Sequence, residues 1–476
     1  MALQIYNTLS RRKEHFVPLH DKQVGMYTCG PTVYDYPHIG NLKAYVMWDM
    51  VKRTLMFLGY NVKHVMNITD VGHLVSDEDT GEDKMEKGAT REGKTVWEIA
   101  QFYTDIFKKD LTALHIDLDK ILFCNATANI PEQIALVKTL EEKGYTYIIE
   151  DGVYFDTSKF PEYGALARLD KEGLQAGARV ELIPGKKNIT DFALWKFSPK
   201  DQKRQMEWDS PWGKGFPGWH LECSAMSMKY LGETFDIHCG GVDHIPVHHT
   251  NEIAQSEAAT GKLFVKYWMH NNFMLVEGKK MSKSLGNFYT LDDLLQKGYS
   301  AREVRYLFLS SHYRQEQNFT FQGLDQARST LEAIDRFVQD LASYTEGTRD
   351  AHLEQKLQIA QHDFQKNIED DFNIPGALRS VFEIQRYVNP LILQKQISQQ
   401  QAGEILNWLR TIDTILGIFH FDVDLDVPPE VLALVSEREQ ARKKKDFKRS
   451  DELRHQIDQL GYIVRDTSQG QKLEKK

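Results

Sequence analysis

The sequence predicts an α/β fold in which a parallel sheet is interrupted by an insertion and followed by an α-helical bundle and a small C-terminal domain. Three observations predict it. A strand-like VGMYTCG precedes a helical pattern and a second strand-like segment, as in a βαβ unit. From about Phe319 to His420, apolar residues recur at helical spacing, as in LEAIDRFVQDLASY. A turn-rich FDVDLDVPP then leads into a short basic segment, expected to be helical, that ends in KLEKK.

The first βαβ unit consists of VGMYTCG, the helical NLKAYVMWDMVKRTLMFLG and the strand-like NVKHVMNITD. In parallel sheets of this kind, ligands bind beyond the carboxyl ends of the strands. The segments TCGPTVYDYPHIGN and NITD lie at those ends, so we expect a nucleotide to bind there. The sequence therefore predicts a Rossmann-like sheet with its site at this edge.

The chain then leaves this pattern and returns to it. From about Leu118 to Lys214 we expect an insertion with a helix near Pro131–Lys143, hairpin strands in Tyr145–Phe155 and a Gly-rich stretch after Asp170. The α/β pattern resumes with GWHLECSAM, the strand-like TFDIHCGGVDH, the helical HHTNEIAQSEAA and the loop EGKKMSKSLGN. Five segments are predicted: a first half of the Rossmann-like domain at 1–117, the insertion at 118–214, the second half at 215–317, the helical bundle at 318–422 and a basic module at 423–476.

Composition places the chain among ordinary globular proteins. Its 41% hydrophobic and 27% charged residues are typical of that class, and no apolar run approaches the ~20 residues of a membrane helix. The first residues, MALQIYNTLSRRKEHF, lack the apolar core of a secretory signal, and four scattered cysteines are too few for a disulfide scaffold. We expect a cytoplasmic protein without a membrane partner, whose cysteines are free thiols or metal ligands.

The formal net charge of −9 argues against non-specific nucleic-acid binding over the whole surface, because phosphate contacts depend on clustered Lys and Arg. Residues 436–476 differ, since they hold twelve Lys or Arg against eight Asp or Glu, a net of +4. If RNA is a partner, this end of the chain is the expected contact.

Two short motifs lie roughly 240 residues apart: HIGN at His38–Asn41 and KMSKS at Lys280–Ser284. Either alone would be weak evidence, but the pair resembles the HIGH and KMSKS signatures of class I aminoacyl-tRNA synthetases. The resemblance implies activation of an amino acid by ATP, in which positioned cations and donors stabilise the charge that develops on the pyrophosphate. The catalytic residues implied are His38, Asn41, Lys280 and Lys283.

The fourth position of HIGN departs from the usual final histidine of the motif. Asn41 can donate a hydrogen bond but cannot carry charge, so we assign it a binding role. A lone histidine such as His38 is as often a structural residue at a strand end as a functional one. The presence of both motifs favours the functional interpretation.

A metal site is indicated by Cys29, Cys223, His248 and Glu252. His248 and Glu252 are four residues apart and share one face of a helix. There is no CxxC, so spacing alone favours buried apolar cysteines. However, TCGPTVYDYPHIG, GWHLECSAMS and HHTNEIAQSEA are similar to the metal-binding segments of cysteinyl-tRNA synthetases at these four positions. The resemblance implies one Zn²⁺ per chain, which would bind a substrate thiolate far better than the hydroxyl of serine.

The same resemblance implies further site residues. Thr69, Trp219, His238 and Asp243 match positions that hold the amino acid and the adenosine ribose, together with Cys29 and Gly30. The ATP-binding residues implied are His38, Gly40, Asn41, Gly240, Gly241, Asp243, Lys280, Met281, Ser282 and Lys283. Gly240 and Gly241 would allow the backbone to approach the nucleotide closely.

Some residues have no role in this scheme. HCGGVDHIPVHH differs from the family's more familiar HGGGSDLMFPHH at Cys239 and His244, which are spare metal ligands or, as we favour, packing residues. Cys124 is also expected to pack in the interior. The charged segment 77–93 is interpreted as a mobile surface segment near the site.

The C-terminal part resembles the same family. DDFNIPGALRSVFEI is similar to its helical anticodon-binding domain, and ARKKKDFKRSDELRHQIDQLGYIVRDTSQG to its small terminal module. The partners implied are tRNA(Cys) with its GCA anticodon, L-cysteine, and ATP with Mg²⁺. We predict a monomer, because no dimerisation segment stands out.

Two other functions fit parts of the sequence. A cysteine ligase that uses an amino-sugar acceptor would share the activation chemistry but would not need the helical domain and the basic end. A non-catalytic RNA-binding or regulatory paralogue would keep the fold without needing HIGN, KMSKS and four zinc positions. We therefore favour an enzyme that joins cysteine to its tRNA.

Overall fold

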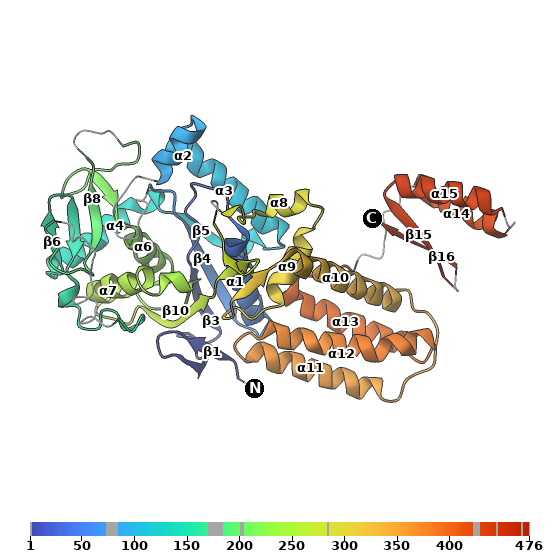
Figure 1. Cartoon of the computed structure of the whole chain (residues 1–476). Coiled ribbons are helices and arrows are strands. Elements are labelled where there is room, and N and C mark those ends of the chain that lie inside the picture. The colour runs from blue at the N-terminus through green and yellow to red at the C-terminus, as the bar shows by residue number, and fades with distance from the viewer. Residues whose placement is uncertain are drawn as a thin grey trace.

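The centre of the molecule is a parallel five-stranded sheet. The computed structural model describes residues 2–72, 84–169, 184–199, 204–282, 285–421, 429–443, 446–467 and 470–475. The strand order is β11–β10–β3–β4–β5, and every neighbouring pair is parallel (Figure 1). The strands are β3 (Gln23–Thr28), β4 (Asn61–Ile68), β5 (Leu122–Asn125), β10 (Phe235–Gly241) and β11 (Val265–Asn271). The predicted parallel sheet is confirmed.

Helices cover both faces of this sheet. They include α1 (Ile39–Phe57), α3 (Val96–Ala113), α6 (Trp219–Leu231) and α7 (His248–Thr260). Successive residues of a strand point to opposite faces. Met26 and Cys239 therefore belong to the core shared with α1 and α3, whereas Tyr27 packs with Cys223 and Met226 of α6 on the other face. The predicted metal ligands gather on this second face.

The strand order places a natural binding crevice beside β3. From β3 the chain proceeds through α1 to β4 on one side, whereas β10 lies on the other side of β3. Ligands bind where the direction of winding reverses in this way, at the carboxyl ends of the strands. The Cys29 amide donates to the carbonyl of Cys239 at 3.0 Å, which holds the two strand ends together at this point.

The insertion forms an antiparallel sheet whose core is shared with α6 and α7. Its elements are α4 (Ile130–Glu142), β6 (Thr146–Ile149), β7 (Gly152–Phe155), β8 (Phe192–Phe197) and β9 (Gly215–Pro217), with the strands in sequence order. Ile149 pairs with Gly152 across a two-residue turn, so the predicted helix and hairpin are both confirmed. The Gly-rich stretch at 170–183 lies outside the described residues.

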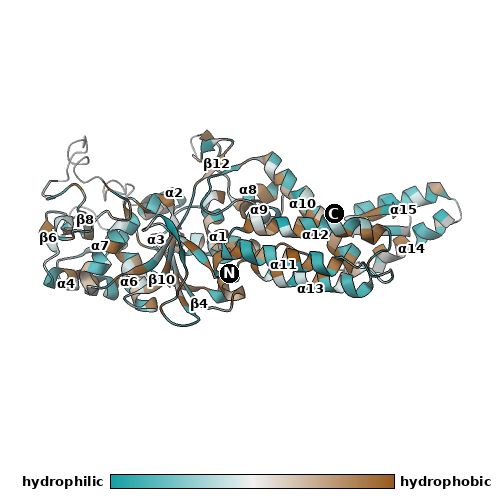
Figure 2. Ribbon diagram, turned by 90° about the horizontal axis from the view of Figure 1, so that it is seen from below, coloured by the Kyte–Doolittle hydropathy of each residue, from teal (hydrophilic) through white to brown (hydrophobic). Residues whose placement is uncertain are grey.

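The second half leads into four long helices that share the core of α1. The second half of the Rossmann-like domain ends with β12 (Met274–Val276), β13 (Lys279–Lys280), α8 (Leu291–Gln296), α9 (Ala301–Leu309) and β14 (Gln317–Phe319). The bundle that follows consists of α10 (Phe321–Ala342), α11 (Leu353–Glu369), α12 (Ile374–Leu393) and α13 (Gln399–Leu416). Figure 2 shows hydrophobic and hydrophilic residues alternating along these helices, as the predicted bundle requires. Among the described helices, none is long and apolar enough to cross a membrane.

The C-terminal module is only partly as predicted. The helices α14 (Pro429–Lys443) and α15 (Phe447–Gln459) were expected from the sequence, but β15 (Tyr462–Thr467) and β16 (Gly470–Lys475) form an antiparallel hairpin. The prediction of a helical module with a KLEKK tail is therefore wrong for the last residues. Val431, Ile457, Tyr462 and Val464 form a small separate core, so the hairpin serves to cover the two helices.

The charged segment 77–93 is also corrected in part. Residues 77–83 lie outside the described residues, but α2 (Lys84–Glu92) is a helix that packs against α3. Met85 and Ala89 are buried in the main core. Two apolar residues four positions apart anchor this helix, so its high charge does not make it a mobile loop.

A buried carboxylate joins the Rossmann-like domain to the bundle, and its removal should destabilise the protein. Asp371 is fully buried after α11 and accepts hydrogen bonds from the Tyr6 amide (2.9 Å), the Tyr313 hydroxyl (2.7 Å) and Arg314 Nε (2.7 Å). We expect Asp371→Asn to lower the free energy of unfolding by about 2–3 kcal/mol, since it removes a hydrogen-bonded charge facing three donors. Urea denaturation followed by circular dichroism measures this.

The neighbouring Asp370 provides the matched control. Its carboxylate pairs with Lys13 at 2.5 Å, but both side chains are substantially exposed. Exposed pairs contribute at most about 1 kcal/mol, so Asp370→Asn should have a small effect. Equal destabilisation by the two substitutions would contradict the role given to Asp371.

Candidate active site

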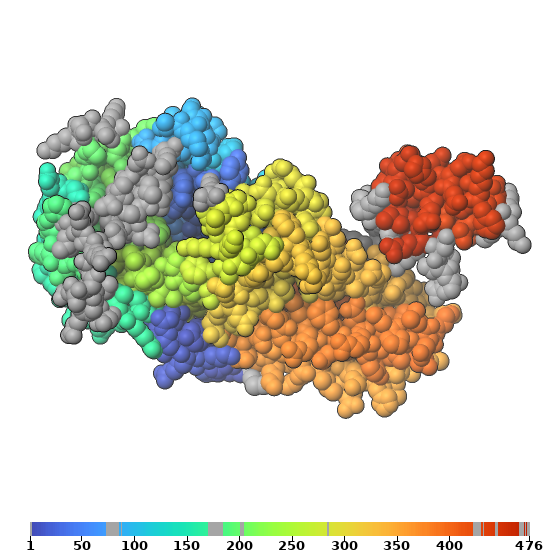
Figure 3. Space-filling view, in the orientation of Figure 1, coloured from blue at the N-terminus to red at the C-terminus, as the bar shows by residue number. Residues whose placement is uncertain are grey.

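A cavity of about 670 Å³ opens at the carboxyl ends of β3 and β10. Figure 3 shows the first half of the Rossmann-like domain (blue) and its second half (yellow-green) side by side, although they are far apart in sequence. Most predicted site residues line this cavity: Cys29, Gly30, His38, Gly40, Asn41, Thr69, Trp219, Cys223, Gly240, Gly241, Asp243, His248, Lys280 and Met281. The structure therefore brings the two motifs and the predicted amino-acid pocket together.

The four predicted metal ligands form one compact group. The donor atoms of Cys29, Cys223, His248 and Glu252 all lie within 4.8 Å of one another, and all four residues are buried. Cys29 follows β3, Cys223 lies on α6, and His248 and Glu252 are one turn apart on α7. Packing of α6 against α7 thus completes a site whose parts are distant in sequence.

The chemistry of this group fits a zinc ion. Two cysteines, an imidazole and a carboxylate are ligands that zinc prefers. Glu252 Oε1 lies 3.0 Å from His248 Nε2 but has no hydrogen-bond partner of suitable geometry among the described residues. A buried acceptor without a partner is costly, and a shared cation would satisfy it.

The surroundings favour the anionic forms of Cys223 and Glu252, whereas burial raises the pKa of the Cys29 thiol well above its usual range. A hydrogen bond with Cys29, assisted by His248 and opposed by burial, lowers the pKa of the Cys223 thiol to about 7. Burial raises the pKa of Glu252, but the facing His238 and His248 outweigh it and lower that pKa to about 2. A thiolate and a carboxylate are therefore accessible near neutral pH.

A second set of potential ligands overlaps the first. Cys29 and Glu252 also lie within 4.8 Å of His238 and His249, all four being buried. His238 Nε2 is 2.8 Å from Glu252 Oε2, and His249 Nε2 is 3.3 Å from Cys29 Sγ. Unlike Cys223 and His248, neither His238 nor His249 lines the cavity. Three members of the predicted set line the cavity, against Cys29 alone of the second set, so the two histidines are better placed to orient the ligands than to present a metal there.

The HIGN motif begins helix α1. His38 is the N-cap residue, and its Nδ1 accepts from the Asn41 amide at 3.2 Å, while Asn41 Oδ1 accepts from the His38 amide at 3.2 Å. This reciprocal capping box gives Asn41 a structural role that the sequence did not reveal. A Cβ on Gly40 would lie 2.5 Å from Met281 Cε, the flexible end of that side chain, so the start of α1 and the KMSKS segment lie in close contact here.

The KMSKS segment meets the cavity through its first residues. Lys280 and Met281 line the cavity, and the Ser282 amide donates to Asn287 Oδ1 at 2.8 Å. Lys283 lies outside the described residues. The amino terminus of α1 faces the same cavity as Lys280, and helix amino termini attract anions such as phosphates. One end of the cavity is thus suited to a polyphosphate and the other to a thiolate.

Three parts of the chain match known families. Residues 15–329 match the class I (C) tRNA synthetase catalytic domain, 363–420 a DALR domain, and 424–472 the cysteinyl-tRNA ligase anticodon-binding domain. The chain is 48% identical to cysteine–tRNA ligase 1 of Burkholderia lata, over 99% of this chain and 97% of that protein. It is 46% identical to the cysteine–tRNA ligase of Chlamydia muridarum over the full length of both. The chain belongs to the cysteine–tRNA ligase family.

Solved structures of other synthetases share the ligase fold. The Mycobacterium tuberculosis methionyl-tRNA synthetase in complex with methionyl-adenylate has a TM-score of 0.60 at 15% identity, over 83% of this chain and 92% of that chain. The Agrobacterium radiobacter K84 agnB2 LeuRS, in a ternary complex with tRNA and LeuAMS, has a TM-score of 0.61 at 12% identity, over 84% and 85%. The predicted class I fold is confirmed.

Sequence reasoning missed several polar residues that support the ligase site. His220 Nδ1 lies 2.9 Å from His248 Nδ1, which leaves His248 Nε2 to face Glu252. Glu222 accepts from the Thr69 hydroxyl at 2.9 Å, and Asn67 bonds both Thr69 and the Gly30 amide. The strings GWHLEC and NITD contain these residues, but only tertiary packing shows what they contact.

The spare cysteines and His244 have different outcomes. Cys239 is fully buried on the face of the sheet opposite the metal ligands. Cys124 is buried in the core on the same face as the ligands, so both packing interpretations are confirmed. His244, in contrast, lines the cavity. Packing alone does not account for that position. His238 does not line the cavity; its Nε2 pairs with Glu252 and its ring stacks on Trp268.

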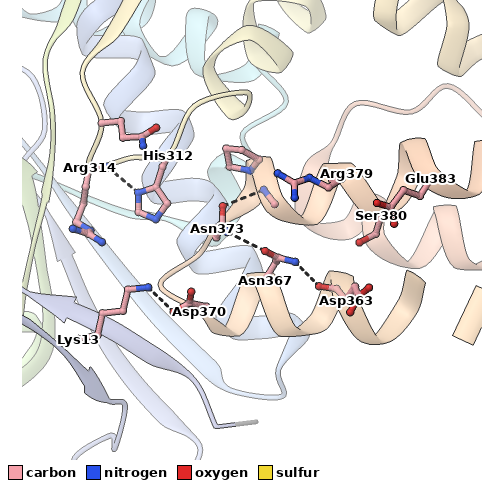
Figure 4. Close-up of a pocket in the computed structure, with 13 residues that line it drawn as sticks. Lys13, His312, Arg314, Asp363, Asn367, Asp370, Asn373, Arg379, Ser380 and Glu383 are labelled. Atoms are coloured by element: carbon pink, nitrogen blue, oxygen red, sulfur yellow. Dashed lines mark hydrogen bonds and ion pairs between the residues drawn. The ribbon is translucent and has the colours of Figure 1, made fainter. Parts of the chain in front are cut away.

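A second cavity of about 620 Å³ lies where the N-terminal hairpin β1 (Gln4–Asn7) and β2 (Arg12–His15) meets α11 and α12 (Figure 4). Its lining contains mutual partners, such as Lys13 with Asp370 and Asn373 with Asn367. Among the described residues, none of its members belongs to a metal-ligand group. This cavity lies at the joint between the Rossmann-like domain and the bundle.

Gly30 is the position in the ligase site least able to accept a side chain. A Cβ there would lie 1.7 Å from the backbone carbonyl oxygen of Asn67, which would force the ends of β3 and β4 apart. We expect Gly30→Ala to cost about 2–4 kcal/mol of stability through overpacking, and to lower cysteine activation more than tenfold. Gly403→Ala, in open space on α13, should instead add roughly 0.5–1 kcal/mol. Similar behaviour of the two variants would contradict the close approach.

Proposed function

We propose that the enzyme activates L-cysteine with Mg·ATP and joins it to the 3′ end of tRNA(Cys), with the substrate sulfur recognised at the site of Cys29, Cys223, His248 and Glu252. One observation carries the proposal: this ligand group and the phosphate-type site at α1 open into the same cavity. Zinc, when bound by these four residues, supplies a Lewis-acidic position for a thiolate. No Mg²⁺ ligand is assigned to the chain.

The chain's residues have separate tasks in activation. The amino terminus of α1, with His38, and Lys280 are placed to bind the ATP phosphates. Gly240, Gly241 and Asp243 line the cavity, and we assign this segment to the adenosine, with Asp243 binding its ribose. The cysteine carboxylate then attacks the α-phosphate, giving cysteinyl-adenylate and pyrophosphate. Lys283 is expected to assist from the same segment.

Metal coordination accounts for selectivity against serine. Cysteine and serine differ in one atom, and a pocket without a dedicated contact discriminates such pairs by only about 10²-fold. A thiolate is a good ligand for zinc, whereas a hydroxyl is a poor one. Trp219 closes this end of the pocket, since its ring centre lies 4.4 Å from that of His248.

Transfer to tRNA uses the rest of the chain. The 2′-hydroxyl of the terminal adenosine attacks the cysteinyl carbonyl, as expected for class I, and AMP leaves as the bond between that carbonyl and the phosphate breaks. The bundle and the C-terminal module, with the net +4 of residues 436–476, are placed in the anticodon-reading role. The monomeric state, the cytoplasmic location and the boundaries of the five segments stay predictions of the sequence.

Cysteine-dependent ATP–pyrophosphate exchange tests the proposal. The expected result is strong exchange with cysteine, negligible exchange with serine and loss of exchange when a chelator removes the metal. Exchange that survives verified metal removal would contradict recognition of sulfur by zinc. No exchange with cysteine, in protein of full metal content, would contradict the assignment of this cavity as the activation site.

A further inference from the structure

His244 is a cavity residue for which the proposed function gives no role. It ends the short turn at Val242–His244, directly after the Gly240–Gly241 pair of β10. Its ring centre lies 5.0 Å from that of His248 and 6.1 Å from that of Trp219. His244 therefore lies beside the metal ligand His248 and directly follows Asp243, the residue assigned to the adenosine ribose.

The two ring nitrogens of His244 have different surroundings. Nδ1 is buried without a hydrogen-bond partner, and a Cβ on Gly240 would lie 2.6 Å from it. A neutral imidazole carries one proton, and placing it on Nδ1 would bury an N–H group with no acceptor. Because a buried N–H without an acceptor costs more than an unpaired ring lone pair, we assign the proton to Nε2. Within the described residues Nε2 has no recorded hydrogen bond, and the side chain lines the cavity, so Nε2–H is a donor available to a ligand.

The substrate's own dimensions indicate what this donor meets. The carboxylate of cysteine is three bonds from its sulfur, so a cysteine held by its sulfur at the metal ligands keeps its carboxylate nearby. Activation joins that carboxylate to the α-phosphate, so it must point toward the nucleotide end of the cavity. His244 lies on that path. Of the two polar groups at the Cα of cysteine, the ammonium cannot accept a hydrogen bond and the carboxylate can.

We propose that His244 Nε2 donates a hydrogen bond to the α-carboxylate of cysteine and orients this nucleophile toward ATP. The inference rests on the proposed binding of the substrate sulfur at Cys29, Cys223, His248 and Glu252. It assigns a specificity role to His244: the site requires a thiol and a carboxylate at a fixed separation. A thiol without a carboxylate gains nothing from His244.

Binding of three thiols distinguishes the sulfur–metal contact from the contact between His244 and the carboxylate. Cysteine carries both charged groups, 3-mercaptopropionate lacks the ammonium, and cysteamine lacks the carboxylate. Binding is measured with the cobalt-substituted enzyme, in which a thiolate ligand adds a sulfur-to-metal absorption band. For His244→Leu we expect cysteine and 3-mercaptopropionate to bind roughly 10-fold to 100-fold more weakly, as for loss of one hydrogen bond to a charged group. Cysteamine should bind to this variant as tightly as it binds to the cobalt enzyme with His244 in place.

Two further variants keep the test sharp. His244→Gln places an amide N–H near the position of Nε2, so it should recover part of the affinity for the two carboxylates. His362→Leu makes the same change as His244→Leu at an exposed position of α11 and should leave all three affinities unchanged. Cobalt content and circular dichroism of each variant establish that the site is intact.

The outcomes are distinguishable from failure of the proposed function. If cysteine adds no absorption band to the cobalt form of the enzyme with His244 in place, the sulfur–metal contact itself is refuted. If the band appears but His244→Leu weakens all three thiols equally, or none of them, the carboxylate contact is refuted while the sulfur site stands. Selective weakening of the two carboxylate-containing thiols, with partial recovery in His244→Gln, would establish the proposal.

Discussion

Replacing Cys223 by serine is expected to remove most of the bound zinc and most of the cysteine-dependent activation. The substitution exchanges a thiol whose pKa is lowered to about 7 for a hydroxyl, which zinc binds poorly. The loss should exceed the roughly 10-fold to 100-fold effect of removing a group that only supports a metal ligand. Metal analysis of the purified variant and ATP–pyrophosphate exchange measure the two effects separately.

Cys124→Ser is the matched control, because Cys124 is equally buried but outside the ligand group. Its thiol donates weakly to the Met66 carbonyl at 3.6 Å, a contact that a serine hydroxyl can replace. We expect full zinc content and activation within about threefold of the unsubstituted enzyme, with a stability loss of about 1 kcal/mol. Equal zinc loss in the two variants would show that any buried polar change disrupts the site, and would contradict the specific role of Cys223.

Replacing Lys280 by alanine is expected to reduce the rate of cysteine activation by about 10²–10³-fold, the usual cost of losing one positioned group that stabilises developing charge. Lys280 lies on β13 and lines the cavity beside Met281, which contacts the start of α1. The KM for cysteine should change little, because the sulfur site is at the other end of the cavity. Pre-steady-state formation of cysteinyl-adenylate measures this rate directly.

The adjacent Lys279 supplies the comparison. Both lysines are exposed on the same two-residue strand, but Lys279 does not line the cavity. Lys279→Ala should therefore leave the activation rate within about twofold, since successive residues of a strand point to opposite faces and an exposed charge is screened by salt. A similar loss in both variants would mean that general positive charge on this loop, and not the position of Lys280, assists the reaction.

Local patterns were enough to predict the framework of the fold. Helical spacing in NLKAYVMWDMVKRTLMFLG predicted α1, and the α7 segment placed His248 and Glu252 on one face, because a helix has a fixed period. The alternation of a strand also separates His238 from Cys239 across the sheet. These are properties of a few neighbouring residues, so the sequence contains them directly.

The missed features depend on contacts between distant segments. The spacing of Cys29 and Cys223 does not indicate a metal site, and only the family resemblance predicts that they share one. The packing of α6 on α7 brings the ligands together. The support of Thr69 by Glu222, and the exposure of His244 to the cavity, have no local pattern. The motif predicts a catalytic and ATP-binding role for Asn41, whereas its capping bonds depend on where α1 begins.

The C-terminal hairpin was missed for a different reason. Its strands are rich in charged and polar residues, which suggested a solvated tail. The signal that was available is the alternation in YIVRDT, where Tyr462 and Val464 point into a small core. Only two apolar positions carry that pattern, so the high charge of KLEKK dominated the interpretation.

X-ray absorption at the zinc edge, with and without cysteine, tests the central claim most directly. With Cys29 and Cys223 as the protein's sulfur ligands, the enzyme alone should show two sulfur neighbours at about 2.3 Å. Addition of cysteine should raise that number to three, whereas addition of serine should leave it at two. A sulfur count that does not change with cysteine would contradict recognition of the substrate by its sulfur.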